Sequence, residues 1–284
     1  SIPGVDLSVE SDIPVGAGLS SSAAVEVATA LAILSFYKDV LPMEEVARIC
    51  HRAENEFIGA RVGIMDQFIS CLGKAGRAML LDCRSFGFQY IPIPPCARMV
   101  ICNTMVKHEH SSGEYNRRRE QCERAVKLLS GHYANIRALR DISIGQLTES
   151  KSLLPEEIYK RALHVVMENE RVQKSAEYLR ASDVRSFGEA MKKSHESLRD
   201  LYEISCRELD VMVEIAESLP GCYGARMTGG GFGGCTLNFV ETALVEEFVQ
   251  QISAQYEQVI GIAPEIYVCD ASDGAARTGH HQPV

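Results

Sequence analysis

The residues with the clearest chemical potential form a short glycine- and serine-rich segment, residues 16–22. Gly16 and Gly18 permit the positive φ angles that let a backbone approach a ligand closely. Three serines then lead into residues 23–36, which are apolar almost all round and indicate a helix buried on most of its surface. Hydroxyls, backbone N–H groups and the positive end of a helix would meet there, which is an anion site suited to phosphate. The alternative is an ordinary helix cap, for which one serine is enough.

A second candidate is Glu54, four residues after Cys50 in a helix expected over residues 43–57. This spacing puts its carboxylate at the edge of an apolar stripe rather than on the solvated face, where a charge needs a partner. Mg²⁺ is one partner, because it takes one or two protein oxygens and completes its shell with phosphate and water. The alternative is a salt bridge to Arg52 or Arg61.

A third candidate is Asp66, which has apolar neighbours and stands at the expected start of a helix over residues 66–72. In this position a carboxylate can accept the proton of a sugar hydroxyl as a general base. The same position also suits an ordinary N-cap. The residues alone leave both interpretations open.

Two further sequence patterns are weaker indications of a functional site. His108 and His110 alternate as metal ligands on a strand would, but no third ligand is evident, so we expect no metal there. Five glycines occupy six positions: Gly229, Gly230, Gly231, Gly233 and Gly234. This number exceeds what one turn requires and favours a backbone that passes close to a ligand or to another loop, although a flexible hairpin is the simpler alternative.

The elements that position these residues follow from periodicity and turn signals. Strands are expected over residues 5–13, 78–82, 86–93, 98–103 and 265–269, and a glycine turn joins two more within residues 224–240. Helices are expected over residues 23–36, 43–57, 66–72, 114–129, 155–180, 183–201, 206–218 and 243–256, with Cys50 and Phe57 on the apolar stripe of the second. The only proline cluster, Pro92, Pro94 and Pro95, marks a domain boundary that divides residues 1–95 from 96–284. The order predicts an α+β protein with two lobes.

Composition narrows the range of partners. Of the 284 residues, 46% are hydrophobic, and 29 Lys and Arg face 38 Asp and Glu, for a net charge of −9. This balance argues against nucleic acid or an anionic membrane as the main partner, so an anionic ligand would need local chemistry to attract it. Ten cysteines never form a C-x-x-C pair, and most lie in apolar runs, which indicates buried reduced thiols in the cytosol rather than a metal cluster or disulfides.

Taken together, the motifs resemble those of the GHMP kinase superfamily. Residues 14–24, Pro-Val-Gly-Ala-Gly-Leu-Ser-Ser-Ser-Ala-Ala, resemble its second motif, and residues 226–235, Arg-Met-Thr-Gly-Gly-Gly-Phe-Gly-Gly-Cys, resemble its third. Residues 63–68 (Gly-Ile-Met-Asp-Gln-Phe), 81–85 (Leu-Asp-Cys-Arg-Ser) and 112–119 (Ser-Gly-Glu-Tyr-Asn-Arg-Arg-Arg) are similar to the branch of this superfamily that phosphorylates galactose. The similarity runs almost from end to end.

The resemblance implies a fold and a reaction. The fold would be α+β and two-lobed: a first lobe like domain 2 of ribosomal protein S5, incomplete here, and a ferredoxin-like second lobe, with the active site between them. The reaction would be ATP-dependent phosphorylation of the anomeric hydroxyl of α-D-galactose, giving galactose 1-phosphate and ADP in the Leloir pathway. The implied setting is the cytoplasm, with galactose and ATP as partners, Mg²⁺ as cofactor, no nucleic acid or membrane, and a monomer or weak dimer.

The resemblance also assigns roles to individual residues. The nucleotide phosphates would lie against Gly16, Ala17, Gly18, Leu19, Ser20, Ser21 and Ser22. Ser22 and Glu54 would be the Mg²⁺ ligands, and Asp66 the catalytic acid–base residue. Gly63, Asp66 and Tyr115 would contact the sugar. The glycines Gly229, Gly230, Gly231, Gly233 and Gly234 would brace the phosphate loop.

One motif of the superfamily has no counterpart in the sequence. Relatives carry a first motif of the form G-R-x-N-x-I-G-E-H-x-D-Y, whose arginine assists transfer and whose acidic residues and histidine hold the sugar. Residue 1 begins just ahead of the second motif, without a Met, so we expect the sequence to be a fragment. The alternatives are that the remainder lies on another polypeptide, or that this relative works without it.

Other functions stay open at this point. A non-catalytic sugar or nucleotide sensor of the same fold would be expected to lose a phosphate-loop hydroxyl, Glu54 or Asp66, and all of these are present. A kinase for a related sugar, such as N-acetylgalactosamine or arabinose, is a second alternative, because sugar selectivity lies partly in the missing motif. An anion-binding structural module is a third.

Overall fold

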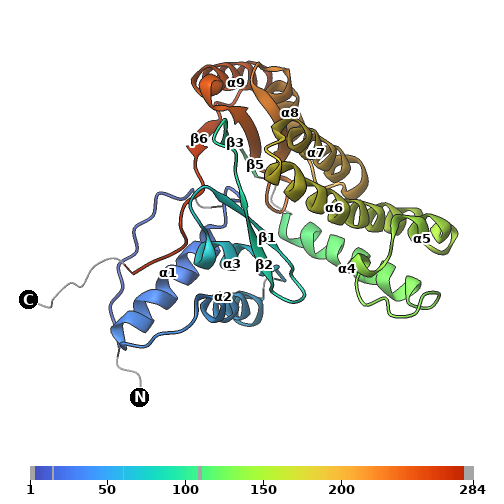
Figure 1. The fold of residues 1–284 in the computed structure, drawn as a ribbon, viewed down its shortest axis with the longest axis horizontal. Helices are drawn as coiled ribbons and strands as arrows, with labels where there is room; N and C mark the ends of the chain where they lie inside the picture. The colour runs from blue at the N-terminus through green and yellow to red at the C-terminus, as the bar shows by residue number, and fades with distance from the viewer. Residues whose placement is uncertain (1–3, 15, 60, 108–110, 278–284) are drawn as a thin grey trace, which may run out of the picture.

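A computed structural model describes residues 4–14, 16–59, 61–107 and 111–277. The first part of the chain forms three helices and a two-stranded antiparallel sheet (Figure 1). The elements are α1 (Ser21–Phe36), α2 (Met43–Arg52), a π-helical turn η1 (Ala53–Ile58), α3 (Met65–Leu72), β1 (Arg77–Leu81) and β2 (Phe88–Pro92). The helices and the β1–β2 hairpin share one apolar core, built around Val27, Leu31, Val46, Cys50, Ile64, Phe68 and Cys71.

Two expectations for this region are wrong. Residues 5–13 alternate in polarity but form no strand: the segment is exposed and pairs with no strand that the structure describes. Alternation marks a segment that can form a strand, yet a strand also needs a neighbour that pairs with its backbone. The second wrong expectation is that α1 is buried on most of its surface. Only Ala23, Val27 and Leu31 are buried, because a single face of the helix packs on α2 and α3.

The second part of the chain contains a four-stranded antiparallel sheet and most of the helices (Figure 1). It comprises β3 (Ala97–Lys107), α4 (Ser111–Leu129), η2 (Leu139–Asp141), α5 (Ile144–Glu149), η3 (Lys151–Leu153), α6 (Glu156–Arg180), α7 (Val184–Ser197), η4 (Leu198–Tyr202), α8 (Arg207–Ser218), β4 (Cys222–Met227), β5 (Gly233–Glu241), η5 (Thr242–Leu244), α9 (Val245–Ile260) and β6 (Glu265–Cys269). The strand order is β4-β5-β3-β6. With helices between β3 and β4 and between β5 and β6, this is the ferredoxin-like β-α-β-β-α-β arrangement.

Alternate residues of the sheet face different neighbours. Val100 and Cys102 pack with α8 and α9 on one face. Met99 and Phe239 face the other way, toward α6, α7 and Ile91 of β2. The β1–β2 hairpin therefore lies against the far face of the larger sheet, and this contact joins the two parts of the chain.

The two parts of the chain are also joined by two reciprocal ion pairs. Asp82 accepts from Arg140 at 2.5 Å, and Asp141 accepts from Arg84 at 2.8 and 2.9 Å. Hydrogen bonds from these guanidinium groups hold the pKa of both carboxyls well below the usual range. Asp82 and Arg84 belong to the Leu-Asp-Cys-Arg-Ser segment, which therefore fastens the β1–β2 turn to η2.

Pro94 and Pro95 separate β2 from β3, which is where the domain boundary is expected. The segment after β6 nevertheless returns to the first part: the N–H of Ala275 donates to the carbonyl of Ser70 at 2.7 Å. The division into residues 1–95 and 96–284 stays a prediction. All ten cysteines are free, and Cys83 and Cys96 are exposed rather than buried. Among the described helices, none combines the length and the apolarity needed to cross a membrane.

Candidate active site

The glycine–serine segment ends at the first turn of α1. Ser20 occupies the N-cap in a left-handed conformation (φ 58°), and its side chain makes no capping hydrogen bond. The first backbone N–H to bond within the helix is that of Ala24, which donates to the carbonyl of Ser20. The N–H groups of Ser21, Ser22 and Ala23 bond to none of the described residues, so they remain available to an anion at the positive end of a 16-residue helix.

The glycine hairpin between β4 and β5 lies directly against this segment. A Cβ on Gly229 would be 3.2 Å from the carbonyl oxygen of Gly18, and one on Gly234 would be 3.0 Å from that of Ala17. The thiol of Cys235 also donates to the carbonyl of Ala17, at 3.0 Å. Side chains at the two glycines would push the loops apart, which explains why the hairpin needs glycine at both positions.

Glu54 lies inward because the helix changes its winding. After Arg52, α2 continues as the π turn η1, whose extra residue rotates the following side chains around the axis. Glu54 is only 9% exposed, whereas Phe57, expected on the apolar stripe, is 88% exposed. The partner of Glu54 is the side-chain amide of Gln67 in α3, which donates to it at 2.5 Å. Among the described residues Glu54 makes no ion pair with Arg52 or Arg61.

Glu26 is a second carboxylate in the same group, and the sequence analysis missed it. It follows Ser22 by one turn of α1 and accepts a hydrogen bond from the Gln67 amide at 3.2 Å. Burial raises the pKa of Glu26, and the nearby charge of Glu54 raises it further, against the opposing effect of the Gln67 hydrogen bond. The signal in the sequence was a lone acidic residue inside an apolar helix.

The donor set of this group fits Mg²⁺. Ser22 lies one turn before Glu26 on α1, and the carboxylates of Glu26 and Glu54 converge on one amide. The side-chain oxygen of Gln67, Oε1, is buried and has no partner among the described residues. Hard oxygen ligands of this kind suit Mg²⁺. Within the described ranges no three His, Cys, Asp or Glu side chains gather as a metal cluster, so the ion would complete its shell with phosphate and water.

Asp66 lies in the first turn of α3, beside Gln67. The N-cap of this helix is Ile64, so Asp66 does not fill the capping role considered above. Its side chain is partly exposed and makes no hydrogen bond or ion pair with any residue that the structure describes. Asp66 is therefore a carboxylate that is free to accept a proton.

Gly63 and Tyr115, two of the three residues assigned to the sugar, lie on segments that contact each other. Gly63 follows Val62, whose carbonyl lies 3.0 Å from Nε2 of His51. Arg119 of α4 donates to the carbonyl of Arg61 at 2.7 Å, which fastens this loop to the helix that carries Tyr115. Tyr115 also faces the glycine hairpin, since a Cβ on Gly230 would lie 3.9 Å from its ring. His108 and His110 lie outside the described residues.

Comparisons with known proteins agree on the family. A protein-family model described as "GHMP kinases N terminal domain" matches residues 1–74. A second family model, described as "GHMP kinases C terminal", matches residues 175–258. The chain is 44% identical over 277 residues to a galactokinase of Roseiflexus sp. (strain RS-1), covering 98% of this chain and 71% of that protein. It is 42% identical over 275 residues to a galactokinase of Homo sapiens, covering 96% and 68%.

A solved structure gives the same result. The structure of Lactococcus lactis galactokinase complexed with galactose superimposes with a TM-score of 0.90 at 32% identity. The match covers 94% of this chain and 69% of that one. Identity at this level over nearly the whole chain, together with the match of the fold, leads to one conclusion: the chain belongs to the GHMP kinases and, among them, to the galactokinases.

Proposed function

We propose that the chain transfers the γ-phosphoryl group of Mg-ATP to the anomeric hydroxyl of α-D-galactose, giving galactose 1-phosphate and ADP. The observation that carries the proposal is the position of Asp66, a carboxylate with no partner among the described residues, next to the Gln67 amide that bridges Glu26 and Glu54. A proton acceptor for the sugar hydroxyl thus adjoins oxygen ligands suited to the metal of the nucleotide. Phosphoryl transfer depends mainly on such positioning and charge neutralisation.

The nucleotide end of the site is residues 16–22. We propose that Gly16, Ala17, Gly18, Leu19, Ser20, Ser21 and Ser22 surround the phosphates of ATP. The N–H groups at the start of α1, which bond to none of the described residues, support this role, because they offer donors and a partial positive charge to an anion. A chain with a net charge of −9 needs such a local device. We propose that the glycines at 229, 230, 231, 233 and 234 keep the segment in place from behind, and the close approaches of Gly229 to Gly18 and of Gly234 to Ala17 support this role.

Ser22 and Glu54 would hold the Mg²⁺ that accompanies ATP. This ion supplies neutralisation of the phosphate oxygens during transfer. Gln67 orients the Glu54 carboxylate, because its amide donates to one oxygen and leaves the other free. Glu26 accepts from the same amide and so fixes the rotamer of Gln67.

The sugar end of the site comprises Gly63, Asp66 and Tyr115. Asp66 accepts a hydrogen bond from the anomeric hydroxyl and orients it toward the γ-phosphorus. A carboxylate is a weak base, so the proton moves to Asp66 late, as the new O–P bond forms. We further propose that the protein acts in the cytoplasm as a monomer or weak dimer, which sizing by light scattering would check.

The direct test is ³¹P NMR of the protein with Mg-ATP and galactose. The proposal expects galactose 1-phosphate and ADP in equal amounts. Parallel reactions with N-acetylgalactosamine and with arabinose give no product if galactose is the preferred substrate, and product only with one of them would identify a different sugar kinase. Binding of Mg-ATP and galactose without any turnover would instead identify a sensor and overturn the proposal.

A further inference from the structure

A buried arginine lies behind the glycine hairpin and outside the site described above. Arg118 of α4 is 6% exposed. Its guanidinium donates to the carbonyl of Tyr202 at 2.7 Å and to the carbonyl of Glu203 at 2.8 Å, and it pairs with Glu114 at 3.1 Å. One planar group therefore bonds two consecutive backbone carbonyls, a geometry that the fork of an arginine fits and a lysine does not.

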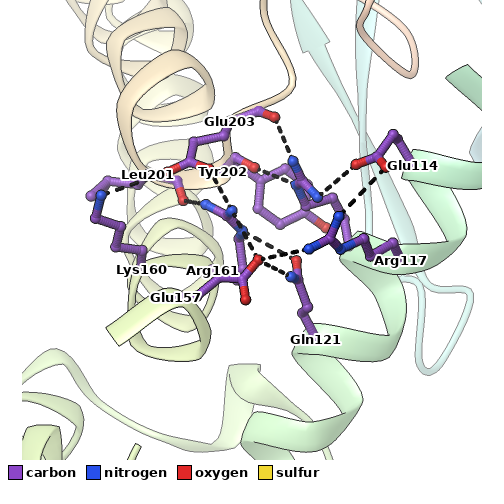
Figure 2. Close-up of polar contacts among 10 residues, drawn as sticks. Glu114, Arg117, Gln121, Glu157, Lys160, Arg161, Leu201, Tyr202 and Glu203 are labelled. Atoms are coloured by element: carbon purple, nitrogen blue, oxygen red, sulfur yellow. Dashed lines mark hydrogen bonds and ion pairs between the residues drawn. The ribbon is translucent and has the colours of Figure 1, made fainter. Parts of the chain in front are cut away.

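The two carbonyls lie at the end of a π turn. The last carbonyls of a helix lack partners within it and carry partial negative charge. Arg118 satisfies the end of η4 on one side, and Arg161 of α6 bonds the carbonyl of Leu201 at 2.6 Å on the other. Figure 2 shows Leu201, Tyr202 and Glu203 facing Arg161 and the α4 residues Glu114 and Gln121.

The residues that follow η4 contact the glycine hairpin. The chain reverses at Glu203, which is left-handed (φ 55°), and the next carbonyl, that of Ile204, accepts from the N–H of Phe232 at 2.8 Å. A Cβ on Gly231 would lie 2.2 Å from this carbonyl oxygen, so the two backbones are in direct contact. Arg118 itself lies 5.9 Å from the centre of the Phe232 ring.

These contacts form a continuous path from α4 to residues 16–22. Arg118 holds Tyr202 and Glu203, Ile204 holds the hairpin at Phe232, and the far side of the hairpin meets the phosphate segment through Gly229, Gly234 and Cys235. We propose that Arg118 is a positioning residue for phosphoryl transfer, which sets the distance between the glycine hairpin and the nucleotide phosphates. The inference rests on the proposed role of residues 16–22 in holding ATP.

Cysteine labelling tests the path without any ligand. Cys235 and Cys102 are both 0% exposed, and burial raises the pKa of each thiol, so either one reacts only when the structure around it opens. Cys235 adjoins Ala17, whereas Cys102 lies in the core beneath α8 and α9. In Arg118→Ala, site-resolved alkylation of Cys235 should accelerate by about tenfold while Cys102 is unchanged, because the opening is local. Equal acceleration of both would mean general destabilisation and would overturn the inference.

Kinetics give the second readout. A displaced hairpin should raise the KM for Mg-ATP and lower kcat by up to about 10²-fold in Arg118→Ala, with the KM for galactose nearly unchanged. Millimolar guanidinium should restore part of the lost kcat by filling the vacated site. Arg124→Ala is the matched control, since Arg124 lies on the same helix with an exposed side chain and its loss should change none of these values. An Arg118→Ala protein with wild-type KM values and slow Cys235 labelling contradicts the inference.

Arg118→Lys covers the case in which the alanine variant fails to fold. A lysine keeps the charge but bonds one carbonyl at a time, so its Cys235 labelling and its KM for Mg-ATP should fall between those of the wild type and Arg118→Ala. Wild-type values in a folded lysine variant would overturn the inference. A wild-type protein that neither binds nor uses ATP, but whose Cys235 still responds to Arg118, would refute the proposed function alone.

Discussion

Gln67 donates its side-chain amide to Glu54 at 2.5 Å and to Glu26 at 3.2 Å, and so joins two carboxylates from different helices. No cation among the described side chains pairs with either carboxylate. Two acidic groups that share one neutral donor repel each other, and a divalent cation would relieve that repulsion. Because Gln67 is adjacent to Asp66, the same amide also fixes the first turn of α3, where the proposed base lies.

Asp66→Asn is the first prediction. The amide keeps the size of the side chain but cannot accept the sugar proton, so turnover should fall by about 10²–10⁴-fold. Binding of Mg-ATP, followed by calorimetry, should stay close to that of the wild type because Asp66 does not contact residues 16–22. Undiminished turnover would exclude Asp66 as the base.

Glu54→Gln is predicted to raise the Mg²⁺ requirement. The variant removes one charge from the oxygen ligands, so the Mg²⁺ concentration for half-maximal activity should rise by about tenfold or more, as for other changes at metal sites. Glu56→Gln is the control, since Glu56 belongs to the same π turn but is exposed. Indistinguishable magnesium titrations for the two variants would remove Glu54 from the metal site.

Glu26→Gln is predicted to change how stability depends on pH. The pKa of Glu26 is raised in the folded protein, first by burial and then by Glu54. The folded state therefore binds this proton more tightly than the unfolded state, and stability falls as the pH rises through the raised pKa. Glu26 is only half-buried, so solvent screens these effects and the loss of stability at neutral pH should be small.

The Glu26→Gln variant should not lose stability in this way as the pH rises. Urea unfolding without Mg²⁺ should give Glu26→Gln a higher free energy of unfolding than the wild type at pH 7, and a smaller difference at pH 4. Added Mg²⁺ should stabilise the wild type more than the variant, because it neutralises the charge that the variant lacks. A variant that is less stable than the wild type at pH 7 would show that Glu26 is held by favourable contacts instead.

Much of the fold was predictable because its signals are local. Helices and strands of the second lobe follow their expected periods, and β6, for example, covers the residues expected for it. Residues 5–13 carry the same kind of signal without becoming a strand. The reason is that strand formation is decided by pairing with another segment, which alternation in one segment does not report.

The details of the site depended on contacts that no local pattern encodes. The stripe predicted from Cys50 to Phe57 assumed a constant helical period, and the π turn broke it, burying Glu54 and exposing Phe57. Glu26 joined the group through Gln67, 41 positions away in the chain. Arg118 lay in a run of arginines typical of a solvated helix face, and only the packing of η4 against α4 separates it from its neighbours.

One further close approach lies at the start of β4, where α7 crosses this strand. A Cβ on Gly188 would lie 1.9 Å from the carbonyl oxygen of Tyr223, and one on Gly224 would lie 2.1 Å from the carbonyl oxygen of Gly188. Helix and strand thus touch backbone to backbone at this crossing. The same helix reaches the end of β4 through His195, whose Nδ1 accepts from the N–H of Met227 at 3.3 Å.

Gly188→Ala should therefore force α7 away from β4. Overpacking of this kind costs about 1–3 kcal/mol or more, because neither backbone can yield as a side chain would. Gly145→Ala is the control: in α5 its nearest contact would be Ser143 Oγ at 3.9 Å, and alanine there should leave stability unchanged or raise it by up to about 1 kcal/mol. Urea unfolding of both variants measures these changes in the free energy of unfolding. Equal stabilities would mean that α7 and β4 separate without cost, and the crossing could then not support the strand that leads into the hairpin.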